Sequence, residues 1–355
     1  MLLKKVDKLL GPMLARIFQL RQRKIPLPPV VSHILIIRPG GIGDAVHLIP
    51  TIQAIKTEHP SATIDILAEK RNADVFALCS DVAQVFLYDR PIEFLTLLRR
   101  RYDVIIDTEQ WHQLSALVAR LIRSHYKIGF ASNDRRQFFT HGVDYAHDDY
   151  EMVSFSHLLK PLAIPFTIDL TRPFLQVPSV AMHRAHELLA GLDGPFVTLF
   201  PGASIPERRW RVDKFRELAR RLNQNGLRLV IVGGADDRAA GEEIVKAGGV
   251  NLAGRTSLIE TAAILEQSTL LVSGDSGVLH LAVGLGTPTV SLFGPGIAAK
   301  WAPRGDWHRV LNLSLDCSPC TRFGTTPPCP VASRCIEEIG VEEVFQQVMA
   351  LRCDS

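Results

Sequence analysis

Four segments of the chain place small residues or carboxylates directly after a run of apolar residues. They are residues 34–44 (ILIIRPGGIGD), 200–204, 232–237 and 273–277. An apolar run without alternation is typical of a strand that is covered on both faces. Glycine in the following turn lets the backbone approach a ligand closely. Because open α/β sheets bind ligands outside the carboxyl ends of their strands, we expect these four segments to carry the chemistry.

The first segment places a carboxylate, Asp44, between a glycine-rich turn and an apolar helix pattern. A nicotinamide-binding loop of the G-x-G-x-x-G type would fit Gly41 and Gly43 but needs a third glycine at position 46, where valine stands. This mismatch disfavours a nicotinamide-dependent oxidoreductase. We therefore expect the turn to aim Asp44 at a substrate hydroxyl.

The later segments offer a site for an anion. Residues 275–277 lead into a predicted helix over 277–284, and a helix N-terminus favours a pyrophosphate. Arg208 and Arg209 could pair with its charge. Asp236 could bind ribose hydroxyls, as acidic residues do in dinucleotide-binding folds.

Each of these residues also has a plainer interpretation. Asp275 could be a helix N-cap, and the two arginines could form a solvated face. His280, like His47, could be a histidine with satisfied hydrogen bonds in the core. Four such strand ends in one chain favour a ligand site over separate structural roles.

The elements that would position these residues alternate between strand and helix. Strands are predicted over 34–37, 63–68, 85–88, 104–106, 196–200, 228–232, near 251, over 270–273 and over 289–293, and helices over 180–190, 212–224, 236–247, 258–267, 277–284 and 341–351. This rhythm predicts parallel sheets, and 355 residues favour two domains. We predict an α/β fold of two Rossmann-like doubly wound domains that face each other across a cleft.

The predicted domain boundaries follow from this pattern. They give an N-terminal extension over 1–32, a first domain over 33–177, a second domain over 178–340 and a C-terminal helix over 341–355 that could pack back on the first domain. Residues 171–178, with two prolines, are the expected linker.

The net charge of +3 belongs to the N-terminal extension. Residues 1–24 hold seven Lys and Arg and one Asp, which leaves the rest of the chain slightly acidic and argues against a nucleic-acid partner. Met13, Leu14, Ile17 and Phe18 fall on one helical face, and a basic amphipathic helix suits an anionic membrane surface. Packing on the protein itself, or a frayed terminus, is the alternative. No apolar run is long enough to span a bilayer, and no signal peptide is expected.

Cys317, Cys320, Cys329 and Cys335 form the pattern C-x2-C-x8-C-x5-C. Four thiolates in a short loop could bind a structural zinc ion, and the first C-x2-C pair has the usual spacing. The wider spacing of the second half argues against zinc. The alternative is four reduced thiols packed in a loop, or a cysteine pattern typical of the family that binds no metal.

Several motifs together make the chain similar to a known family. They are RPGGIGDAVHLIP at 38–50, PGAS and ERRW within 201–210, VGGADD at 232–237, SGDSGVLHLA at 273–282 and LFGP at 292–295. In order and spacing they resemble glycosyltransferase family 9, the heptosyltransferases of bacterial lipopolysaccharide, from residue 33 to about 350. The resemblance implies a GT-B fold whose second half binds the nucleotide and whose first half binds the acceptor.

The resemblance also implies residue roles. Asp44 matches the catalytic base of the family, and Arg208 stands where a lysine usually contacts the diphosphate, which keeps the charge but presents a fork. We assign donor binding to Gly41, Gly43, Ser204, Asp236, Asp275, Ser276, Gly277 and His280, with Asp237 as the alternative to Asp236. The chain has no D-x-D motif, so no catalytic cofactor or metal is expected.

The resemblance therefore implies an inverting transfer of heptose from ADP-heptose to a lipopolysaccharide core or related glycan on a lipid-linked acceptor. We expect the enzyme in the bacterial cytoplasm, on the inner membrane if residues 1–24 bind it. Arg99–Arg101, Arg135 and Arg136 could meet acidic groups of the acceptor, or could be solvated. A GT-B-like sugar-nucleotide epimerase and a noncatalytic membrane-associated module are the alternatives.

Overall fold

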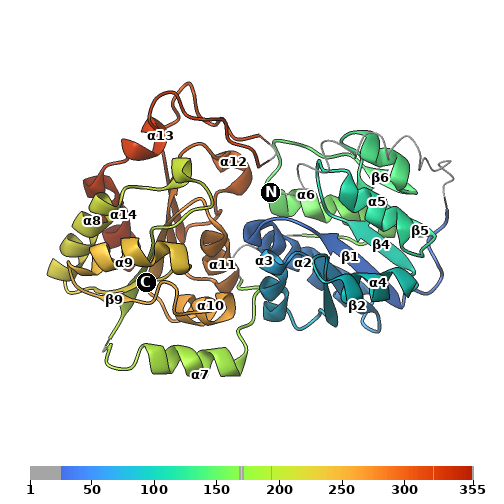
Figure 1. Ribbon diagram of the computed structural model, residues 1–355, viewed down its shortest axis with the longest axis horizontal. Helices are drawn as coiled ribbons and strands as arrows, with labels where there is room; N and C mark the ends of the chain where they lie inside the picture. Colours follow the sequence, from blue (N-terminus) through green and yellow to red (C-terminus); the bar gives the residue numbers. More distant parts are fainter. Residues whose placement is uncertain (1–24, 168, 170–171, 193, 323, 354–355) are drawn as a thin grey trace. The chain divides into compact units, whose positions relative to one another are not determined.

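The computed structural model describes residues 25–167, 169, 172–192, 194–322 and 324–353. The basic amphipathic segment expected over residues 1–24 lies outside the described residues. The chain divides into two compact units between residues 168 and 169, and each unit is built on its own six-stranded sheet (Figure 1). Within the described ranges, no helix is both long enough and apolar enough to cross a bilayer.

The first unit is a parallel sheet with the strand order β3-β2-β1-β4-β5-β6. Its strands are β1 (His33–Arg38), β2 (Thr63–Ala68), β3 (Gln84–Leu87), β4 (Val104–Asp107), β5 (Tyr126–Phe130) and β6 (His141–Val143). Its helices and 3-10 turns are α2 (Ile42–Glu58), α3 (Lys70–Ala73), η1 (Asp74–Leu78), α4 (Pro91–Arg99), α5 (Leu114–Leu121), η2 (Asp134–Phe138), α6 (Glu151–Ser156) and η3 (His157–Leu162). The strand order reverses between β1 and β4, and open sheets bind ligands at such a reversal.

Helices cover both faces of this sheet (Figure 1). Leu35, Ile37 and Ile105 face the side of α4 and α5, where they pack with Leu97 and Ala116. The two-residue period of a strand sends their neighbours to the other face, which α2 and α6 cover. Both faces are therefore buried, as the unbroken apolar run of β1 predicts.

The sequence pattern does not predict β5 or β6. Lysine and glycine interrupt the apolar pattern of β5, which reads YKIGF, yet all five of its residues are buried. The Lys127 ammonium donates to three backbone carbonyls at the end of α5, at 2.6, 2.7 and 2.9 Å. Gly129 leaves the space that the ring of Phe139 fills. Burial lowers the pKa of Lys127 to about 7, and the helix C-terminus supplies the acceptors that let its side chain lie in the core.

The second unit repeats this plan with the order β12-β11-β10-β7-β8-β9, so its reversal lies between β7 and β10. Its strands are β7 (Phe196–Phe200), β8 (Arg228–Ile231), β9 (Val250–Asn251), β10 (Leu270–Gly274), β11 (Thr289–Phe293) and β12 (His308–Asn312). Its helices and turns are α7 (Ser179–Leu188), η4 (Pro206–Arg208), α8 (Val212–Gln224), η5 (Ala235–Asp237), α9 (Arg238–Val245), α10 (Leu258–Glu266), α11 (Gly277–Leu285), α12 (Ala298–Trp301), α13 (Arg334–Glu337) and α14 (Val341–Cys353).

The C-terminal helix α14 packs within the second unit. Val344, Val348 and Leu351 form an apolar stripe at helical spacing, and they are buried in the same core as Phe215 and Leu218 of α8. This differs from the expectation that the helix crosses back onto the first domain. The physical reason is that α8 presents a matching apolar face to it.

The sequence pattern also misses the last strand, β12. A buried histidine in this strand should make the stability of the protein depend on pH. The His308 ring lies 2.9 Å from the Thr289 hydroxyl, and burial lowers the pKa of His308 to about 4. Below pH 6.5 the unfolded chain takes up a proton that the folded chain does not, so stability falls as the pH drops from 6.5 towards 4. We expect this group to account for about 2 kcal/mol of lost stability at pH 5.

Urea unfolding of the wild type and of His308→Gln at pH 7 and pH 5 measures this effect. The wild type should lose more stability than the variant on acidification. An equal loss in both proteins would show that His308 is not the group responsible.

Candidate active site

Asp44 lies at the strand-order reversal of the first unit. It follows the carboxyl end of β1 and stands in the first turn of α2, whose N-cap is Gly41. A helix N-terminus favours a negative charge at this position. The Asp44 side chain is 23% exposed, so solvent and ligands can reach it. Gly43 lies in the same turn, so the structure brings Gly41, Gly43 and Asp44 together.

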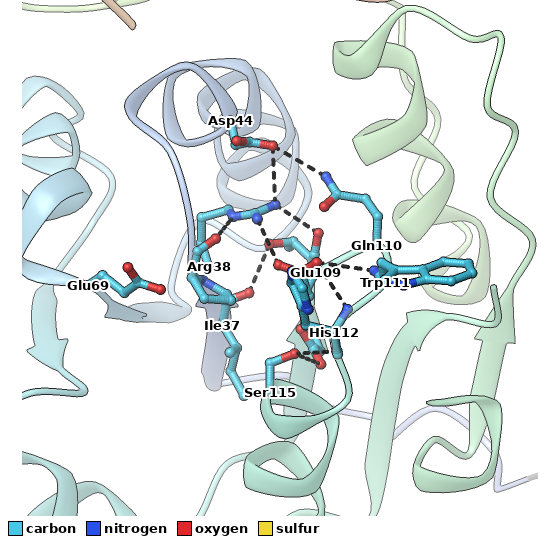
Figure 2. A network of polar contacts seen from close by, with 12 residues as sticks. Ile37, Arg38, Asp44, Glu69, Glu109, Gln110, Trp111, His112 and Ser115 are labelled. Carbon is cyan, nitrogen blue, oxygen red and sulfur yellow. Dashed lines mark hydrogen bonds and ion pairs between the residues drawn. The ribbon is translucent and has the colours of Figure 1, made fainter. Parts of the chain in front are cut away.

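A buried arginine lies beside this carboxylate (Figure 2). Arg38, the last residue of β1, is 1% exposed, and its Nη1 lies 3.8 Å from Asp44 Oδ1. Its Nη2 donates to Glu109 Oε2 at 3.3 Å, and its Nη1 donates to the carbonyl of Thr108 at 2.9 Å. Burial disfavours the charge, but Asp44 and Glu109 outweigh it and raise the pKa of Arg38 above its usual value. The guanidinium therefore stays charged, and its hydrogen bonds hold it in place beside Asp44.

A glutamine from the other side of the reversal completes the contacts. Gln110 follows β4, and its Nε2 donates to Asp44 Oδ1 at 3.4 Å and to Glu151 Oε1 at 2.5 Å. Glu151 is fully buried in the first turn of α6, where Oε2 accepts from the Tyr145 hydroxyl at 2.9 Å. Burial and the Glu151 charge raise the pKa of Tyr145 far above its usual value, so this hydroxyl keeps its proton.

Sequence reasoning missed Arg38, Glu109, Gln110 and Glu151. A usable signal was present in residues 104–110 (VIIDTEQ), where an apolar strand again runs directly into carboxylates and an amide. This is the same strand-end pattern that identifies Asp44. The buried glutamate of α6 has no comparable signal.

The matching reversal of the second unit holds a second ion pair. Arg208 Nη1 lies 3.0 Å from Asp275 Oδ2, with side chains 18% and 7% exposed. Arg208 follows β7 and Asp275 follows β10, the two strands at which the order reverses. Gly296 leaves the space beside Asp275 Oδ2 that a Cβ would fill. The structure thus brings together two residues that the sequence places 67 positions apart.

Helix α11 begins beside this pair. Its N-cap is Ser276, whose hydroxyl accepts from the Leu279 amide at 3.2 Å, so the cap is not Asp275. Gly277 is the first helical residue. His280 is 3% exposed, and its ring centroid lies 6.0 Å from that of Trp301. These residues line one end of a buried helix that points its positive dipole end at the edge of the sheet.

The turn after β8 separates the two candidate ribose ligands. Asp236 is exposed in η5. Asp237 turns inward, where Oδ2 accepts from the Gly234 amide at 2.9 Å and the carboxylate fills the space beside Gly202. Asp236 is therefore the more exposed of the two carboxylates. Ser204 is also exposed, in the loop after β7.

The structure corrects the interpretation of the arginines. Arg135 is fully buried and pairs with Asp107 at 2.8 Å, so it cannot meet an acceptor. Arg99–Arg101 precede β4 and therefore lie at the opposite end of the sheet from Asp44, and Arg100 pairs with Asp65 at 2.9 Å. Arg136 is exposed.

The four clustered cysteines line one small pocket. Cys317, Cys320, Cys329 and Cys335 share it with Glu207, and all four thiols are free. Cys329 Sγ accepts from the Ser333 amide at 3.2 Å. In the part of the chain that the structure describes, no group of three or more His, Cys, Asp and Glu side chains is placed to hold a metal ion.

Two parallel doubly wound sheets, each with its candidate residues at the strand-order reversal, define a two-domain α/β protein of the GT-B type. A glycosyl transferase family 9 structure from Veillonella parvula DSM 2008 matches 93% of this chain and 100% of its own, with a TM-score of 0.82 and 17% identity. The structure of ADP-heptose lipopolysaccharide heptosyltransferase II from Escherichia coli matches with a TM-score of 0.73 over 91% and 99% of the two chains, at 22% identity.

Sequence comparison carries the assignment further. Lipopolysaccharide heptosyltransferase 3 of Escherichia coli K12 is 27% identical over 286 residues, which cover 74% of this chain and 82% of that protein. The profile of glycosyltransferase family 9 (heptosyltransferase) matches residues 94–329. The chain belongs to this family, and the resemblance seen in the motifs is confirmed.

Proposed function

We propose that this glycosyltransferase moves a heptose from ADP-heptose to a lipid-linked saccharide of the lipopolysaccharide core or a related glycan, with inversion at the anomeric carbon. The observation that supports it most is the partly exposed carboxylate of Asp44 beside the buried cation of Arg38, in a chain of the heptosyltransferase family. The names of its relatives, lipopolysaccharide heptosyltransferase 3 and ADP-heptose lipopolysaccharide heptosyltransferase II, support the donor and the acceptor class.

Asp44 acts on the acceptor. It takes the proton of the acceptor hydroxyl as that oxygen forms its bond to the anomeric carbon. The bond from the anomeric carbon to the diphosphate breaks on the opposite side, and the diphosphate leaves with the electron pair. One displacement of this kind inverts the configuration, and no covalent sugar–enzyme intermediate forms.

The second unit binds the donor. The diphosphate meets the N-terminus of α11 at Ser276 and Gly277, whose amides favour an anion. Arg208 turns its fork from Asp275 to the phosphate oxygens as charge develops on them. Asp236 accepts hydrogen bonds from the ribose hydroxyls. These groups neutralise the leaving diphosphate without a metal ion, and the roles of Ser204, Gly41, Gly43 and His280 in donor binding remain predictions.

A donor panel tests the proposal. ADP-heptose, ADP-glucose, GDP-mannose and UDP-glucose are compared by thermal shift, and the stabilising donor is then used in transfer assays with lipopolysaccharide core acceptors. We expect ADP-heptose to raise the melting temperature most and to give a product with inverted anomeric configuration by NMR. Preference for a UDP-sugar, or release of free sugar without an acceptor, would contradict it.

We also propose that the four cysteines hold a structural zinc ion. Four sulfur donors on one pocket suit the tetrahedral preference of zinc, although the side chains must close around the ion to bind it. Elemental analysis of purified protein should find about one zinc per chain, and Cys317→Ser with Cys335→Ser should remove it. Cys79→Ser, in the first unit, is the matched control. A metal-free wild type that is fully folded would exclude the site.

A further inference from the structure

The two carboxylate oxygens of Asp44 have different surroundings. Oδ1 faces Arg38 and the Gln110 amide, at 3.8 and 3.4 Å (Figure 2). Oδ2 lies on the side of Gly41, where a Cβ at that glycine would be only 3.1 Å from it. One oxygen is thus held by the protein, and the other lies over a residue that has no side chain.

Contacts with residues other than Asp44 hold the Arg38 side chain in place. Its Nε and Nη1 donate to the carbonyls of Pro39 and Thr108, Nη2 donates to Glu109, and Cζ lies 5.6 Å from the ring centroid of Phe155. Glu109 is also anchored, because Oε1 accepts from the amides of the two residues after Gln110. The cation therefore cannot follow Asp44 if the carboxylate moves.

A contact with Glu151 holds the Gln110 side chain in place. Its amide nitrogen lies between two carboxylates, and only an N–H group can face both of them, which sets the orientation of the amide. Glu151, fully buried, holds the nitrogen at 2.5 Å and is in turn held by Tyr145. A chain of contacts from α6 thus ends on Asp44 Oδ1.

We propose that Gln110 and Arg38 are positioning residues that hold Asp44 through Oδ1, so that Oδ2 is the atom that takes the proton of the acceptor hydroxyl. This inference rests on the proposed role of Asp44 as the base. Gln110 and Arg38 contribute orientation, because a carboxylate that rotates freely spends little time aligned with the hydroxyl. Gly41 keeps the space beside Oδ2 open for the acceptor.

Gln110→Ala removes the amide, and Arg38→Lys keeps the charge but loses the fork. We expect each variant to lower kcat about 10-fold with the KM of both substrates within about twofold of the wild type. A general loss of structure would instead change KM and the melting temperature together. Gln267→Ala, whose Nε2 donates to a backbone carbonyl in the second unit at 2.9 Å, is the matched control and should leave kcat unchanged.

A double-mutant cycle separates this inference from the proposed function. If Gln110 acts through Asp44, adding Gln110→Ala to Asp44→Asn should change the remaining rate less than about twofold. An inactive Asp44→Asn with a fully active Gln110→Ala, or an additive effect in the double variant, would overturn the positioning role. A fully active Asp44→Asn would instead overturn the proposed base.

Discussion

Asp44→Asn is expected to lower kcat for sugar transfer by about 10³-fold, while the Kd of the nucleotide sugar stays within about twofold. Asparagine has nearly the same size but cannot accept the proton of the acceptor hydroxyl. The fold should tolerate the change, because Asp44 is partly exposed and Arg38 keeps Glu109 as an ionic partner at 3.3 Å. Donor binding should persist because the residues proposed to meet the diphosphate and the ribose, Arg208, Asp236 and the start of α11, belong to the second unit.

Steady-state transfer assays and donor titration by calorimetry measure the two quantities separately. Asp103→Asn is a suitable control, since Asp103 accepts from the amides of Ser32 and His33 at the opposite end of the same sheet. Near-normal turnover in Asp44→Asn would show that another group removes the proton. A parallel loss of donor affinity would show that Asp44 contributes to donor binding.

The parts of the fold that the sequence predicts are those with local signals. The largely apolar sequences of β1, β7 and β10 identify buried parallel strands, and the glycines at or after their ends identify the turns that follow. The strands that were missed lack such an apolar run, because polar residues interrupt them and need specific partners in the fold. Lys127 can lie within β5 only because the end of α5 supplies three carbonyl acceptors.

The same distinction applies to the candidate site. Asp44 and Asp275 could be predicted because each follows its own strand directly. The contacts that hold Asp44 could not, because they join Arg38 to Glu109 across 71 positions and Gln110 to Glu151 across 41. Strand order decides which strand ends become neighbours, and the reversal between β1 and β4 is a property of the whole sheet.

Arg135→Met is expected to lower the free energy of unfolding by about 4 kcal/mol at pH 7. Arg135 and Asp107 are both fully buried and lie 2.8 Å apart, and Asp107 also accepts from the Ser115 hydroxyl at 2.9 Å. Removing the cation leaves a carboxylate in the core without its counter-charge. If Arg135 instead bound acidic groups of the acceptor, Arg135→Met would change the KM for the acceptor with little loss of stability.

The pH dependence of this variant follows from the same pair. Burial raises the pKa of Asp107, and Arg135 opposes that rise. Without Arg135 the pKa rises further above the unfolded value, so the variant regains stability as the pH falls and the carboxyl takes up a proton. Urea unfolding at pH 7 and pH 5 should show that the loss of stability in Arg135→Met is smaller at pH 5. Combining Asp107→Asn with Arg135→Met should recover part of the lost stability.

Arg220→Met, which breaks an exposed pair with Glu217, is the control and should change stability little at either pH. A deficit that does not depend on pH would mean that lost packing, and not the unpaired carboxylate, destabilises the variant.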